Sequence, residues 1–207
     1  LALLPDDPRE LFNSVEKELR TPMATLIAAS DMLASQLDPQ HPARGYARLI
    51  RSESDRLRDT LNDLALLALP LEFTARPMLI APVISSLAGG FRLAAEHAGV
   101  RWAVEVPSSL RVSADADALK LALARVVRFC LESMSHGGTL LIRGESDRET
   151  TVLRISDSGP SVPVTLLNQA FNPYVALAER RPGMALALLR RVVEHLGGGV
   201  AVWNNPE

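Results

Sequence analysis

The first third of the chain shows two helical patterns of apolar positions. In the first, apolar residues recur at spacings of three, four and six or seven: Val15, Leu19, Met23, Leu26, Ile27, Leu33 and Leu37. A break follows at residues 38–42, where two prolines cannot continue a helix. The second pattern runs through Tyr46, Leu49, Ile50, Leu57, Leu61, Leu64 and Ala68. A short loop between two long helices predicts an antiparallel helical hairpin.

Around Pro70 the pattern changes, and from Glu72 on short strand-like runs alternate with helical ones. We expect strands at residues 77–80, 100–106, 139–143, 151–156 and 200–203. We expect helices at residues 82–98, 115–134, 164–170 and 184–196. Asp115 is placed as an N-cap, and Gly197 to Gly199 follow the last helix, so they are interpreted as its C-terminal end and not as a phosphate loop.

Together these patterns predict a two-part architecture. A lone hairpin cannot bury both of its apolar stripes, whereas two copies can bury them in a dimeric four-helix bundle. The mixed strands and helices predict an α/β sandwich with helices on one face of a mixed sheet. We therefore expect a hairpin domain over residues 1–70 and an α/β domain over residues 74–207.

Composition and charge exclude several classes of protein. The 207 residues are 47% hydrophobic and carry a net charge of −2, so no basic field attracts nucleic acid or anionic lipid. The single cysteine, Cys130, is expected in the core and excludes an internal disulfide framework and a cysteine-rich zinc site. No run of 18 apolar residues occurs, and the start LALLPDDP is no signal peptide. Without an initiator Met, the expectation is a cytoplasmic fragment of a longer chain.

The segment Glu16-Lys17-Glu18-Leu19-Arg20-Thr21-Pro22-Met23 resembles the phosphoacceptor box Ser-His-Glu-Leu-Arg-Thr-Pro-Leu of bacterial sensor histidine kinases. Residues from about 74 on resemble the ATP-binding domain of the same family, which has the GHKL fold. The resemblance implies that residues 1–70 form a dimerisation and histidine-phosphotransfer-like domain. It likewise implies that residues 74–207 form a catalytic, ATP-binding-like domain.

Lys17 stands where the family has its phosphoacceptor histidine. A neutral imidazole, with a pKa of about 6.5, is a nucleophile near neutral pH, whereas an exposed ammonium has a pKa of about 10.4 and no free lone pair. His41 falls in the loop, and the three other histidines fall in the second domain: His97, His136 and His195. Autophosphorylation is therefore expected to be lost.

The nucleotide motifs are also incomplete. The family places two asparagines ten and fourteen residues after an Asp, where they hold Mg²⁺ and phosphate; counting from Asp115 gives Arg125 and Phe129. Three residues that match the family's ATP site remain: Asp157, Gly159 and Gly183. The resemblance implies that Asp157 is the aspartate that contacts adenine. Arg125 could still contact phosphate directly. The prediction is no metal and no cofactor, with ATP and Mg²⁺ binding lost or weak.

Two interpretations are open for each surviving motif. In the family pattern, an acid and a threonine spaced like Glu18 and Thr21 support kinase and phosphatase chemistry, the threonine orienting the water that attacks an aspartyl phosphate. Thr21 could instead relieve the kink at Pro22. Asp157 is equally well explained as a turn-former. For Lys17, a solvated helix residue without chemistry is favoured over a contact with a partner's acidic pocket.

The favoured function is binding by a catalytically degenerate histidine kinase. Its expected partners are a second copy, a response regulator receiver domain or another histidine kinase, with no nucleic acid and no membrane contact. The expected docking surface is on the first helix: Glu16, Lys17, Arg20, Thr21 and Met23. The alternatives are a phosphatase that uses Glu18 and Thr21, and a still-active kinase or phosphotransferase with an unrecognised acceptor.

Overall fold

The computed structural model describes residues 8–68, 73–134, 136–147, 150–178, 181–182 and 184–205. The chain divides into two compact units, Leu1–Pro70 and Leu71–Glu207. No helix in the described part of the chain is long and apolar enough to cross a membrane.

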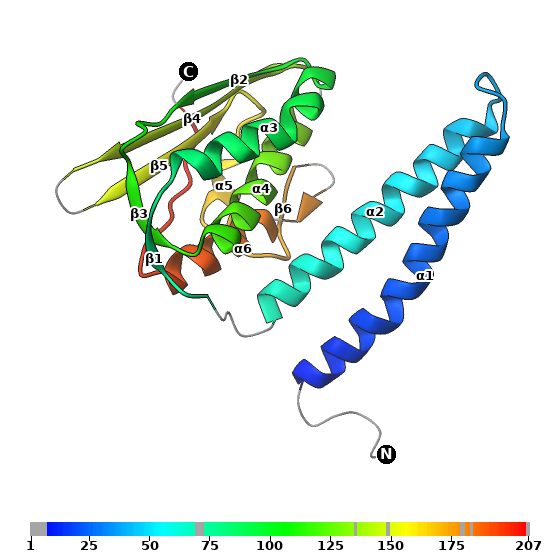
Figure 1. Cartoon of the computed structure of the whole chain (residues 1–207), viewed down its shortest axis with the longest axis horizontal. Coiled ribbons are helices and arrows are strands. Elements are labelled where there is room, and N and C mark those ends of the chain that lie inside the picture. Colours follow the sequence, from blue (N-terminus) through cyan, green and yellow to red (C-terminus); the bar gives the residue numbers. More distant parts are fainter. Residues whose placement is uncertain are drawn as a thin grey trace. The chain divides into compact units, whose positions relative to one another are not determined.

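The first unit is the predicted helical hairpin, formed by α1 (Pro8–Gln36) and α2 (Ala43–Ala68) (Figure 1). Its turn is held by short-range hydrogen bonds. The Asp38 carboxylate accepts from the backbone N–H of Gln40 at 2.9 Å, and Nδ1 of His41 accepts from the N–H of Ala43 at 3.1 Å, at the start of α2. The hairpin prediction, with its break at residues 38–42, is confirmed.

Few of the described side chains of the hairpin are buried: Met23, Ala47, Asp63, Ser30 and Ser54. The hydroxyls of the two serines donate to backbone carbonyls of their own helices at 2.8 Å. Large apolar side chains remain 41–57% exposed on both helices: Val15, Leu19, Leu26, Leu33, Leu49, Ile50 and Leu57. The hairpin by itself therefore leaves most of its apolar stripes in contact with water.

The described residues of the second unit form one three-stranded sheet and two separate two-stranded sheets. In the larger sheet, ordered β2-β4-β5, β2 (Val100–Glu105) runs parallel to β4 (Gly138–Ser146), which pairs antiparallel with β5 (Thr151–Asp157). In one of the smaller sheets, β1 (Arg76–Leu79) pairs antiparallel with β3 (Arg111–Ala114). A short antiparallel pair, β6 (Ala176–Ala178) and β7 (Arg181–Pro182), lies later in the chain.

Three helices pack on one face of the larger sheet: α3 (Ala81–His97), α4 (Ala116–Ser133) and α6 (Met184–His195) (Figure 1). A single turn, α5 (Val164–Leu167), precedes α6. Alternate residues of β4 face the core, where Leu140 and Ile142 are fully buried, while Arg143 is exposed on the opposite face. The predicted α/β sandwich with helices on one face of a mixed sheet is confirmed.

The predicted caps of two helices are present. Oδ1 of Asp115 accepts from the backbone N–H groups of Asp117 and Ala118 at 3.1 and 3.0 Å, as an N-cap does. After α6, Gly197 has φ +82° and donates to the carbonyl of Glu194, while Gly198 donates to that of Val193. This pair of bonds is the Schellman motif, so these glycines end the helix.

Three features of the structure differ from the expectations. Residues 200–203 form no strand, so that prediction is wrong. The side-chain amide of Asn204 bonds the backbone of Val162 in both directions, at 2.9 and 2.8 Å, so a side chain takes the place of a backbone ladder there. The helix expected over residues 164–170 is reduced to α5, and the short strand β3 was not expected.

Candidate functional site

The acceptor position lies on the solvent side of α1. Lys17, Glu18 and Thr21 are all exposed. Residues three and four apart on a helix are neighbours on its surface, so Thr21 adjoins both Lys17 and Glu18. Within the described part of the chain, the Lys17 ammonium makes no hydrogen bond or ion pair. The position therefore presents an uncommitted cation to solvent.

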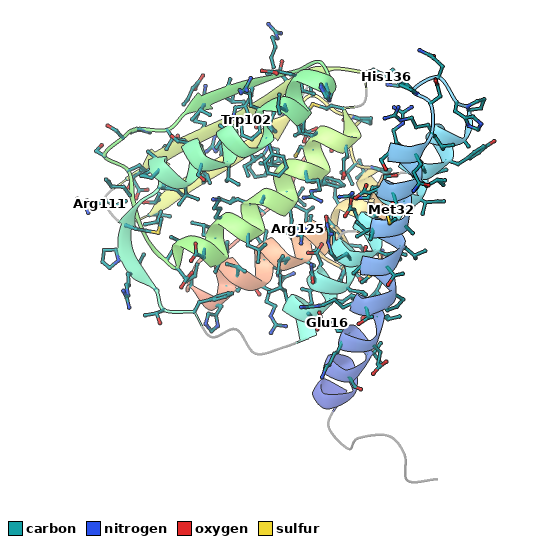
Figure 2. The ribbon with its side chains drawn as sticks, turned by 45° about the vertical axis from the view of Figure 1, so that its right-hand side comes forward. Glu16, Met32, Trp102, Arg111, Arg125 and His136 are labelled. Carbon is teal, nitrogen blue, oxygen red and sulfur yellow. The ribbon has the colours of Figure 1, made fainter. Side chains whose placement is uncertain are left out.

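Neighbouring side chains of this surface have different roles. Arg20 forms an ion pair with Glu16 one turn earlier, so this carboxylate is engaged by Arg20 (Glu16 is labelled in Figure 2). Met23, expected on the docking surface, is only 7% exposed and packs within the hairpin. The partner-facing role given to Met23 is therefore corrected. The remaining docking surface, Glu16, Lys17, Arg20 and Thr21, is called the α1 surface below.

Pro22 changes the backbone beneath the α1 surface. The helix continues through it, but proline has no N–H, so the carbonyl of Glu18 loses its donor within the helix. The Thr21 carbonyl accepts from the Thr25 hydroxyl at 3.2 Å. The Thr21 hydroxyl itself makes no hydrogen bond among the described residues, which leaves it available to a partner or to water.

The second group of candidate residues lies in the α/β unit, where Asp157 ends β5. Oδ1 of Asp157 accepts from the N–H of Gly159 at 2.8 Å. Ser158 between them is bonded to Thr139 of β4 twice: its N–H donates to the Thr139 carbonyl at 3.1 Å, and its Oγ accepts from the Thr139 N–H at 2.9 Å. The turn is thus fixed to the sheet before any ligand arrives.

Gly159 is required by close packing. A Cβ at this position would lie 2.7 Å from Oδ1 of Asp157 and 2.9 Å from Oγ of Ser133 at the end of α4. Any side chain would therefore displace the Asp157 carboxylate or the Ser133 hydroxyl. Sequence reasoning selected Asp157 and Gly159 but not Ser158 or Ser133. The position of Ser158 inside the same motif was the one available signal for it.

Cys130 lies on α4 next to Asp157. It is 4% exposed, and burial raises the pKa of its thiol strongly, with the charge of Asp157 and a hydrogen bond to it acting in the same direction. The thiol is therefore neutral and unreactive at physiological pH. The expectation that Cys130 belongs to the core is confirmed, and its neighbour is the candidate adenine-contacting carboxylate.

At the other end of the resembled ATP site, the side chains at the two asparagine positions offer no ligands for a cation. Arg125 projects from α4 and is half-buried (Figure 2), while Phe129, one turn later, packs against the hydrophobic core. Mg²⁺ requires oxygen ligands, which neither side chain has. Within the described ranges, no three His, Cys, Asp or Glu side chains gather where they could hold a metal ion. Gly183 lies outside the described residues.

The residues present therefore fit a nucleotide only in part. The Asp157–Gly159 turn retains the shape and charge that could contact a base. The positions of the two family asparagines fit neither Mg²⁺ nor Mg²⁺-bound phosphate. No step of phosphoryl transfer can be derived from this arrangement.

Comparison with protein families gives two matches in the same order as the two units. Residues 8–69 match the His Kinase A (phospho-acceptor) domain. Residues 114–207 match the family described as histidine kinase-, DNA gyrase B-, and HSP90-like ATPase.

Curated relatives align over most of this chain. The sensor protein PfeS of Pseudomonas aeruginosa is 30% identical over 198 residues, which cover 92% of this chain and 43% of PfeS. The sensor histidine kinase ZraS of Salmonella typhi is 22% identical over 194 residues, covering 93% of this chain and 42% of ZraS. The chain thus spans less than half the length of these relatives.

Solved structures share the fold. Full-length ShkA in complex with AMPPNP has a TM-score of 0.73 at 21% identity, covering 95% of this chain and 43% of ShkA. Histidine kinase ThkA in complex with the response regulator protein TrrA has a TM-score of 0.68 at 22% identity, covering 96% of this chain and 58% of that chain. On the matches to both domains, the aligned relatives and the shared fold, the chain belongs to the bacterial sensor histidine kinase family.

Proposed function

We propose that this chain is a degenerate histidine kinase of two-component signalling, which acts by binding a partner and does not phosphorylate itself. The observation that carries the proposal is the exposed Lys17 at the acceptor position of α1. A lysine ammonium has no free lone pair with which to attack a phosphoryl group. The four histidines of the chain belong to the hairpin loop or to the α/β unit, so none of them is on this turn of α1.

The nucleotide site supports the same conclusion. Arg125 and Phe129 supply no oxygen for Mg²⁺, so the metal that would neutralise the triphosphate lacks its ligands. The Asp157–Gly159 turn is intact, so residual contact with a base is compatible with the structure. ATP and Mg²⁺ binding is therefore proposed to be weak or lost, and the α/β unit to act as scaffold or regulator.

We propose a response regulator receiver domain as the partner of the α1 surface. The ThkA–TrrA complex supports this choice, since there a protein of the same fold is in complex with a response regulator. The Lys17 ammonium makes no ion pair among the described residues, and an acidic pocket on a receiver would supply a partner for it. Another histidine kinase is the alternative partner, through the exposed apolar stripes of the hairpin.

The chain has two lysines, which provide a matched test of this binding. Purified receiver domains are titrated against the intact chain and against Lys17→Glu and Lys120→Glu. Lys120 is also exposed on a helix, but in the α/β unit. We expect Lys17→Glu to weaken binding at least tenfold and Lys120→Glu to leave it unchanged. If the two variants bound receivers with equal affinity, the α1 surface would not be the binding site.

A phosphatase activity is the second candidate. It is favoured by the exposed and unbonded Thr21 hydroxyl beside Glu18, an arrangement that could orient a water. The test follows loss of aspartyl phosphate from a phosphorylated receiver, with and without the chain. If the chain is a phosphatase, Thr21→Ala abolishes the acceleration and Thr25→Ala, one turn further along α1, retains it. A rate equal to that of the receiver alone eliminates the activity.

A further inference from the structure

The strand β2 is an edge of the three-stranded sheet. It pairs with β4 on one side, and among the described residues no strand pairs with its other side (Figure 1). An open edge presents unpaired N–H and C=O groups and is a ready template for another strand. Proteins commonly protect such edges with proline or a bulge, but β2, of sequence VRWAVE, has no proline, and its register with β4 has no bulge.

The pairing with β4 determines which backbone groups face outward. The Gly138 N–H donates to the Gly99 carbonyl at 3.4 Å, just before the ladder begins. Successive residues of a strand direct their backbone groups to opposite sides, so Arg101, Ala103 and Glu105 bond towards β4. The outward N–H and C=O groups are then those of Val100, Trp102 and Val104.

We propose that β2 pairs antiparallel with β2 of a second copy of this chain, centred on Ala103. In this register Trp102 and Val104 lie opposite each other, and both have outward backbone groups, so they exchange hydrogen bonds. Arg101 lies opposite Glu105 of the second copy, and the two-fold symmetry makes this pair twice. The sequence Arg-x-x-x-Glu is thus self-complementary only when the strand is reversed about its centre.

The charges needed for this pairing are available. Arg101 is exposed and has no ion pair within the described part of the chain. Glu105 bonds Arg143 of β4 through Oε2 alone, at 2.7 Å to Nε and 2.6 Å to Nη2, which leaves Oε1 for a second cation. Opposed residues at non-hydrogen-bonded positions bring their side chains closest, which favours the Arg101–Glu105 contacts.

The opposite face of the same edge is apolar. Val100, Trp102 and Val104 line an open groove of about 540 Å³ between β2 and α3 (Trp102 is labelled in Figure 2). The α3 wall of the groove carries the small residues Ala88 and Gly89 and the ion pair of Arg92 with Glu96. Val104 is 45% exposed. In the proposed register, Trp102 of one copy lies beside Val104 of the other, so pairing would remove apolar surface from water on both sides of the two-fold axis.

The test uses the intact chain and sedimentation velocity over a concentration series. The two charge reversals, Arg101→Glu and Glu105→Arg, each place like charges opposite each other, so each should weaken association through this edge at least tenfold. In a mixture of the two variants, one copy carries a carboxylate at both positions and the other carries a guanidinium at both. Opposite charges then meet at both pairs, so mixing should restore the association. High salt should weaken wild-type association.

A third variant tests the backbone without changing charge. Val104→Pro removes an outward N–H but no bond to β4, so it should abolish the edge association while the chain stays folded by circular dichroism. The inference is overturned if the wild type forms no species larger than Val104→Pro does. It is equally overturned if mixing the charge variants restores nothing, or if β2 captures only an extended segment of a different protein. None of these outcomes depends on the proposed receiver binding.

Discussion

Close packing around Gly159 determines how much of the nucleotide site the chain can preserve. The hydrogen bond from Gly159 to Asp157 forms a turn with no space for a Cβ, and Ser158 holds that turn to β4. This turn is maintained by the fold itself. Its preservation therefore does not require that the chain still bind ATP.

Gly159→Ala should destabilise the α/β unit by about 1–3 kcal/mol, because its Cβ would meet the Asp157 carboxylate and the Ser133 hydroxyl. Gly90→Ala is the matched control. Gly90 lies in α3 with no atom within 4 Å of an added Cβ, so alanine there should stabilise the helix by about 0.5–1 kcal/mol. Urea unfolding of both variants measures the difference. Two equal shifts of the same sign would contradict the packing described.

At the scale of residues, the sequence identified candidate site residues better than it predicted whether they are exposed or buried. Asp157 and Gly159 were selected from a motif, and both form the expected turn. Met23 was assigned to the docking surface because it lies on the same helix as Lys17, but its side chain is buried in the hairpin. Helical periodicity shows which positions are apolar, and it does not distinguish those that face α2 from those that face a partner.

The helices of the hairpin are joined by an ion-pair cluster. Arg51 of α2 pairs with Asp31 of α1 and bonds Asp55 of its own helix at 2.8 Å. Arg58 pairs with the same Asp55 at 2.7 Å. The hydrogen bond from Arg51, with a smaller contribution from the charge of Arg58, lowers the pKa of Asp55 below its ordinary value of 3.8.

This lowered pKa predicts how hairpin stability depends on pH. A carboxylate with a lower pKa in the folded state stabilises the fold above the unfolded-state pKa, and its contribution is lost as the pH falls through the folded-state value. Asp55→Asn should therefore lower the urea midpoint at pH 7, and the gap from wild type should narrow below about pH 4. Helical circular dichroism at several pH values measures it. If the difference in urea midpoint between wild type and Asp55→Asn widened on acidification, the stated direction of the Asp55 pKa shift would be wrong.

Capping signals were the most informative features at the scale of elements. Asp115 before an apolar-periodic run and glycines after the last helix both acted as predicted, since each works through local backbone geometry. The strand prediction for residues 200–203 was wrong because a strand depends on a distant partner. Their apolar alternation is typical of a strand, but a strand needs a backbone partner, and here Asn204 bonds Val162 by its side chain.

At the scale of the whole molecule, the sequence did not predict which strands pair with each other. The order β2-β4-β5, with one parallel and one antiparallel pair, depends on contacts between residues far apart in sequence. The local patterns predicted the hairpin, the α/β sandwich and most of the helices, and the family resemblance added the GHKL fold. The open edge of β2 became visible only once the strand order was known.

The exposed stripes of the hairpin predict a homodimer through a four-helix bundle. Leu57 is 55% exposed on α2, and a second hairpin would bury it. On a Val104→Pro background, which removes any edge pairing, Leu57→Glu should shift the chain towards monomer in sedimentation equilibrium. Val164→Glu changes an equally apolar residue, 76% exposed in the other unit, and should leave the dimer intact. A dimer insensitive to Leu57→Glu would argue against the bundle.

The central claim is that the chain does not phosphorylate itself. Two independent features support it: Lys17 at the acceptor position, and the missing magnesium ligands at Arg125 and Phe129. The most direct measurement is incubation of the intact chain with γ-labelled ATP and Mg²⁺, beside a histidine kinase that retains its acceptor histidine. We expect no label on the wild type, and none on Lys17→His, because restoring the nucleophile does not restore the metal site. Acid-labile label on the wild-type chain would contradict the account, and label on Lys17→His alone would show that the nucleotide site still works.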